Sequence, residues 1–98
     1  MIADVIRNAN SEHEVYRLLT SYIQSVPYPS KAQARIAEPI TGISDVKKRF
    51  TQLMFELDKA SKSLDDNSCA TIKEGMHALS VALDRLYALN GQQGKQTH

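Results

Sequence analysis

Apolar residues between positions 44 and 90 recur at alternating spacings of three and four residues. This spacing is typical of a helix whose apolar stripe packs along another helix. Residues 65–68, Asp-Asp-Asn-Ser, interrupt the pattern with side chains that favour turns and helix caps. The stretch therefore predicts two long antiparallel helices, about 44–66 and 68–90. Their stripes are Val46, Phe50, Leu53, Leu57, Ala60 and Leu64, then Ile72, Met76, Leu79, Leu83, Leu86 and Asn90.

Folding about residues 65–68 sets each member of the first stripe beside a member of the second. The predicted pairs are Leu64 with Ile72, Ala60 with Met76, Leu57 with Leu79, Leu53 with Leu83, and Phe50 with Leu86. Two helices share only one face and cannot enclose a core. The rest of the chain, or another copy of it, must therefore cover this hairpin.

The chain before the hairpin predicts a third main helix and two short ones. Ile2, Val5 and Ile6 favour a short helix over about 2–8, and Ser11 with Glu14 forms a capping box that starts a helix over about 12–24. Prolines at 27 and 29 end that helix. A second short helix is expected over about 31–38, before Pro39, and Ser44 is the expected N-cap of the next helix.

These elements predict an all-α fold, a small antiparallel bundle of three main helices with one or two accessory helices. The length of 98 residues fits one domain, which we place at 1–91. Gly91 is expected to close the last helix. The polar tail 92–98 has little to bury and is expected to be disordered.

Composition narrows the classes of function. Apolar residues make up 42% and charged residues 23%, which is ordinary for a soluble globular domain. The net charge of +1 gives no overall attraction to nucleic acid or to an acidic membrane. One cysteine excludes an internal disulfide. No apolar run reaches the length of a signal sequence or a membrane span, and Asp4 would interrupt an N-terminal leader. We therefore expect a cytoplasmic protein that does not engage membranes.

Candidate chemistry is sparse. Glu74 and His77 share one helical face, as in the Glu-x-x-His half-sites of di-iron bundles, but the motif occurs once and points away from the predicted core. His13 stands between two glutamates that do not face it on a helix. Cys69 lies in a first helical turn, where a half-buried structural role is favoured over reactivity. We predict no catalytic, cofactor-binding or metal-binding residues, and no enzyme activity.

One surface stripe stands out on the back of the first long helix, opposite its apolar stripe. Phe55 lies there among polar residues, and burying it would contribute about 1.5–3 kcal/mol. The connector 27–43, a second protomer or another molecule would each provide cover. The stripe consists of Lys48, Gln52, Phe55, Lys59 and Lys62.

The last helix carries more apolar surface than one neighbour can fill. Beside its stripe lie Ala78, Ala82 and Leu89, and near the opposite face lie Val81 and Ala88. If helix 12–24 covers one side, Val81 and Ala88 either remain for self-association or are isolated apolar residues of the surface, which need no explanation.

Two classes of function remain. The first is a small helical interaction module that binds a copy of itself, with a dimer favoured, or another protein, through the stripe and through Val81 and Ala88. The alternative is a nucleic-acid accessory protein that holds phosphates with Lys48, Lys59 and Lys62 while Phe55 stacks on bases. Glu56 and Asp58 flank that stripe and weaken the alternative. Neither the partner nor the biological process can be read from the sequence.

Overall fold

The computed structural model describes residues 2–26 and 38–96, with side chains described up to Asn90. Within these residues the chain forms helices and no strand, so the all-α prediction is confirmed. The helices are α1 (Ile2–Arg7), α2 (Glu12–Ser25), α4 (Ile43–Lys62) and α5 (Asp66–Gln96). The expected helix 31–38 falls almost entirely on residues 27–37, which lie outside the described part of the chain.

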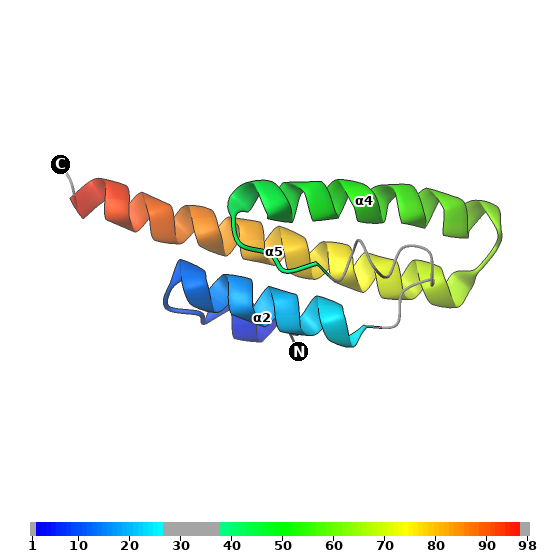
Figure 1. Cartoon of the computed structure of the whole chain (residues 1–98), viewed down its shortest axis with the longest axis horizontal. Helices are drawn as coiled ribbons and strands as arrows, with labels where there is room; N and C mark the ends of the chain where they lie inside the picture. The colour runs from blue at the N-terminus through cyan, green and yellow to red at the C-terminus, as the bar shows by residue number, and fades with distance from the viewer. Residues whose placement is uncertain (1, 27–37, 97–98) are drawn as a thin grey trace.

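Helix α5 is the element that the other three share. It packs against α4, α1 and α2, and Figure 1 shows α4 along one side of it and α2 along the other. The bundle is elongated, with extents of 51 × 22 × 20 Å. None of the described helices combines the length and the apolar character needed to cross a bilayer.

The core follows the two predicted stripes in part. Val46, Leu53, Ile72, Leu79 and Leu86 are buried, as expected. The side of α5 that carries Ala78, Ala82 and Leu89 is also buried, which explains the wide apolar arc of this helix. Four other stripe residues are only half-buried against the core, namely Phe50, Leu57, Met76 and Leu83.

The junction between α1 and α2 is fixed by local capping and by one long-range bond. The Ser11 hydroxyl accepts a hydrogen bond from the Glu14 N–H (3.2 Å), and the Glu14 carboxylate accepts one from the Asn10 N–H (3.2 Å). The Arg85 Nε of α5 donates to the carbonyl oxygen of the fully buried Ala9 (2.9 Å). The junction between the two predicted N-terminal helices is therefore tied to the central helix.

The turn between α4 and α5 comes earlier than predicted. Helix α4 ends at Lys62, and Leu64 adopts a left-handed conformation with φ 58°. The Leu64 N–H donates to the Ser61 carbonyl (3.1 Å) and the Asp65 N–H to the Ala60 carbonyl (3.0 Å), which together form a Schellman motif. Leu64 is 85% exposed, so its assignment to the apolar stripe is wrong.

Asp65 then starts α5. Its carboxylate accepts hydrogen bonds from the Ser68 hydroxyl (2.7 Å) and the Ser68 N–H (3.2 Å). These two bonds lower the pKa of Asp65 below its usual value. The predicted helices 44–66 and 68–90 are wrong at this boundary, because Asp65 acts as a cap and cannot also extend α4.

The early turn changes how the hairpin pairs. One groove brings Val46 and Phe50 of α4 together with Leu79 and Leu83 of α5. The sequence paired Leu79 with Leu57 and Leu83 with Leu53. The predicted register is therefore wrong by about one to two helical turns.

The remaining boundaries differ by smaller steps. Gly42, not Ser44, is the N-cap of α4, and the Asp45 carboxylate accepts hydrogen bonds from the Thr41 N–H and hydroxyl, both 3.0 Å. The backbone bond and then the hydroxyl bond lower the pKa of Asp45. Helix α5 continues through Gly91 to Gln96, beyond the expected end at 90. Residues 97–98, and the side chains from Gly91 onward, lie outside the described chain.

Candidate interaction surface

The structure keeps the predicted lysine stripe of α4 mostly at the surface. Lys48 is exposed, and Phe55 is 66% exposed, so no described part of the chain covers this aromatic ring. Lys59 forms an ion pair with Glu56 (3.6 Å), and Lys62 forms one with Asp58 (3.1 Å). Two of the three lysines in the stripe are therefore ion-paired, and Lys48 lies near the carboxylate of Asp45.

Gln52 departs from the rest of the stripe. Its side chain is half-buried, and its Oε1 atom is buried without a hydrogen-bond partner among the described residues. Three residues earlier, Arg49 is 5% exposed and its Nη1 donates to the Glu38 carbonyl (2.8 Å). Segment 38–42 therefore packs on the Arg49 side of α4, and Gln52 follows Arg49 by about one helical turn.

Val81 and Ala88 do not form the shared surface that the sequence suggested. Val81 is only 7% exposed, whereas Ala88 is exposed. Val81 lies one helical turn before Arg85, whose guanidinium bonds to Ala9 at the α1–α2 junction. The N-terminal helices therefore bury this side of α5, and its reading as a surface residue is wrong.

A hollow of about 550 Å³ lies beside the predicted Glu-x-x-His pair. It is lined by Ile2, Ala3, Tyr22, Lys73, Glu74 and His77. Burial, and then the negative charge of Glu74, raise the pKa of Tyr22. Within the described residues, no group of three or more His, Cys, Asp or Glu side chains that would hold a metal ion occurs. Cys69 is a free, half-buried thiol that packs against the core.

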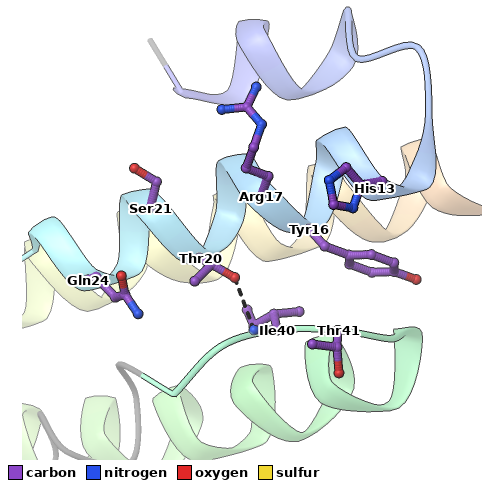
Figure 2. Close-up of a pocket in the computed structure, with 8 residues that line it drawn as sticks. All are labelled: His13, Tyr16, Arg17, Thr20, Ser21, Gln24, Ile40 and Thr41. Atoms are coloured by element: carbon purple, nitrogen blue, oxygen red, sulfur yellow. Dashed lines mark hydrogen bonds between the residues drawn. The ribbon is translucent and has the colours of Figure 1, made fainter.

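A second hollow, of about 480 Å³, lies between α2 and segment 38–42 (Figure 2). The Ile40 N–H donates to the Thr20 hydroxyl oxygen (3.0 Å), and the Ile40 side chain is 2% exposed. Figure 2 shows Arg17 pointing towards α1 and away from Thr41, so the polar groups around the hollow diverge. This arrangement pins segment 38–42 onto α2 and does not focus charge on one point.

The third hollow is the one that sequence reasoning missed as a surface. It is a groove of about 320 Å³ between α4 and α5, lined by Val46, Lys47, Phe50, Thr51, Leu79, Ser80 and Leu83. Met54 (51% exposed) and Tyr87 (49% exposed) flank it, and the Lys47 Nζ lies 5.9 Å from the centroid of the Tyr87 ring. We define the open face as six apolar residues along this groove: Phe50, Met54, Leu57, Met76, Leu83 and Tyr87.

The open face is one side of the α4–α5 hairpin, and the other side is covered. On α4, Phe50, Met54 and Leu57 fall within about 60° of one another around the helix axis. Arg49, which bonds to Glu38, lies on the opposite side of the α4 stripe. Segment 38–42 therefore lies on one side of the hairpin and the N-terminal helices pack on α5, while the described chain leaves the open face to solvent.

One signal in the sequence could have located the open face. Met54 and Tyr87 each border their apolar stripe, and in an antiparallel hairpin both lie on the same edge of the pair. The decisive fact, the side on which α1, α2 and segment 38–42 pack, comes only from the structure.

The fold and surface define a class of protein, a small all-α bundle with an apolar face that the described residues leave uncovered. No known protein family, characterised protein or solved structure matches the chain.

Proposed function

We propose that this protein is a small non-enzymatic interaction module that binds protein through the open face. The observation that supports it is the run of six large apolar side chains on one side of the α4–α5 hairpin, of which Met54 and Tyr87 are exposed and the other four are only partly buried. Phe, Tyr and Met are among the residues enriched at protein interfaces. A face of this composition is suited to packing against another apolar surface.

The energetic case follows from area. Fully burying one large apolar side chain contributes about 1.5–3 kcal/mol. Met54 and Tyr87 each leave about half of their surface in water, at 51% and 49% exposed. Covering the whole open face would therefore contribute several kcal/mol to association. The conformational entropy lost when side chains become ordered at the interface reduces this gain.

A cytoplasmic location is part of this proposal. The single thiol is free and half-buried, and the described fold is held by packing and hydrogen bonds that need no oxidising compartment.

Nucleic-acid binding is the second candidate, because Phe55 is 66% exposed beside lysines. The ion pairs of Lys59 with Glu56 and of Lys62 with Asp58 reduce the positive potential of that stripe. A net charge of +1 adds little to it. The second candidate therefore ranks below the first.

The test uses a photo-crosslinking amino acid placed at Met54 or at Phe55. The two residues are neighbours on α4 and both are more than half exposed, at 51% and 66%, but only Met54 belongs to the open face. In cells that produce the protein, we expect protein adducts from position 54 and few from position 55. Absence of protein adducts from position 54 would contradict the proposal. Nucleic-acid adducts from position 55 would favour the second candidate.

A further inference from the structure

We infer that the occupant of the open face is a second copy of this chain, so that two α4–α5 hairpins face each other in a twofold-symmetric dimer. This inference rests on the proposed function. It depends on the charges that border the open face, because those charges are complementary to their own copies.

Five exposed charged residues lie along the two edges of the open face. Lys47 and Asp58 follow the edge of α4, and Asp66, Lys73 and Asp84 follow the edge of α5. Lys47 and Asp58 are eleven residues apart, as are Lys73 and Asp84, which is about three helical turns and keeps each pair on one edge. Asp58 also pairs with Lys62 of its own helix (3.1 Å), and Lys73 lies between the two acids of its edge.

The hairpin brings the opposite charges of the two edges to the same level. Asp58 and Lys73 are six and nine residues from Leu64 in the turn, and Lys47 and Asp84 are seventeen and twenty residues from it. Each pair is thus offset by only about three residues, or about 4.5 Å. Asp58 and Lys73 lie near the turn, and Lys47 and Asp84 lie near the far end.

Twofold symmetry then sets unlike charges against each other. If the symmetry axis runs along the helices, α4 lies over the partner's α5, and Lys47 comes opposite the partner's Asp84. If the axis runs across the helices, α4 lies over the partner's α4, and Lys47 comes opposite the partner's Asp58. In both arrangements the edges attract while the apolar residues between them are buried.

The size of the face fits a dimer. Helix α4 has 20 residues and is thus about 30 Å long, and two packed helices are about 20 Å wide. The hairpin therefore presents about 600 Å² per partner, or about 1,200 Å² in total, which is the lower end of the range for stable interfaces. Two such hairpins would enclose the core of a four-helix bundle.

The described chain offers no intramolecular cover for the open face. Segment 38–42 is held on the other side of the hairpin, by the bond from Arg49 to the Glu38 carbonyl and by the bond from Ile40 to Thr20. Helix α2, which precedes residues 27–37, packs on α5 away from the groove.

The first test is sedimentation equilibrium on the full chain and on two matched variants. Met54→Glu and Phe55→Glu put the same charge on neighbouring, exposed positions of α4, so neither should unfold the bundle, which circular dichroism checks. We expect wild type and Phe55→Glu at twice the chain mass of 10.9 kDa. Met54→Glu should dimerise at least about tenfold more weakly. A wild-type monomer at about 100 μM, or a dimer unaffected by Met54→Glu, would overturn the inference.

The second test mixes charge-reversed chains. Lys47→Glu alone should weaken the dimer, because it sets two acids against each other. The Lys47→Glu chain should form a heterodimer when it is mixed with the Asp84→Lys chain or with the Asp58→Lys chain, because unlike charges then face each other again. The mixture that associates identifies the symmetry axis. Association of neither mixture would overturn the charge pairing.

Failure of this inference is separable from failure of the proposed function. A wild type that stays monomeric but forms Met54 adducts with another protein overturns the second copy and leaves the interaction module standing. A wild type that is monomeric and forms no Met54 adducts overturns both.

Discussion

Leu64 provides the clearest test of how the hairpin is built. Its φ of 58° lies in the left-handed region, which costs a residue with a Cβ atom about 1–2 kcal/mol. Its side chain is 85% exposed, so it loses little by truncation. Leu64→Gly should remove the backbone strain, while the greater freedom of glycine in the unfolded chain costs about 0.5–1 kcal/mol. The expected net gain is about 0.5 kcal/mol.

The assay is urea denaturation at one fixed protein concentration, since association makes stability depend on concentration. Leu64→Ala is the matched control, because alanine removes the same side chain but keeps the Cβ atom and so should give no gain. Leu64→Asn should gain as well, since asparagine tolerates the left-handed conformation. If Leu64→Gly instead destabilises by about 2 kcal/mol or more, Leu64 is a core residue, as its position in the apolar stripe suggested.

Further predictions concern the core, the helix caps and the histidines. Leu53→Ala should lower the free energy of unfolding by about 2–5 kcal/mol, because Leu53 is fully buried. Leu57→Ala should lower it by less, because Leu57 is only partly buried. Equal losses in denaturation experiments would contradict the observed register. Hydrogen bonds from Ser68 hold the pKa of Asp65 below its ordinary value of 3.8, so the stabilising effect of this cap is present above pH 3.8 and is lost as pH falls through the lowered pKa. In the Asp65→Asn variant, stability should therefore fall less as the pH is lowered. If the melting temperature falls with pH as steeply as in the wild type, Asp65 is not the cap of α5. The purified protein should carry no stoichiometric transition metal and His77→Ala should leave its melting temperature unchanged, which elemental analysis and calorimetry check.

The sequence predicted the helices well where local signals were strong. The Ser11 and Glu14 capping box placed the start of α2 at Glu12, and the prolines after Ser25 are consistent with its end. The wide apolar arc of α5 indicated more than one packing neighbour, and the structure supplies α1 and α2 on that side. These features depend on residues close together in the chain, or on the periodicity of one helix.

The sequence did not predict the register of the α4–α5 hairpin, because two registers are compatible with the same apolar pattern. An apolar stripe repeats about every half heptad, so an antiparallel hairpin that slips by one turn still pairs apolar residues. The deciding feature was Leu64, an apolar residue in a backbone conformation usually taken by glycine. Nothing in the spacing of Ala60 and Leu64 distinguishes a core position from the end of the helix.

The candidate surface could be predicted only in part. Phe55 was correctly placed opposite the α4 stripe, and it is the most exposed aromatic residue among the large exposed hydrophobic side chains of the described chain. The open face required knowledge of which side of the hairpin the N-terminal helices cover. That choice follows from long-range contacts such as Arg85 with Ala9 and Arg49 with Glu38, which no local pattern encodes.

Oxidative footprinting across a dilution series tests the central claim most directly, because it measures whether a second copy covers the open face. Met54 and Phe55 are adjacent and start at 51% and 66% exposed, so each molecule contains its own control. As the protein concentration rises, oxidation of Met54 to the sulfoxide should fall while modification of Phe55 stays constant. Equal oxidation of Met54 at all concentrations would contradict a dimer through the open face.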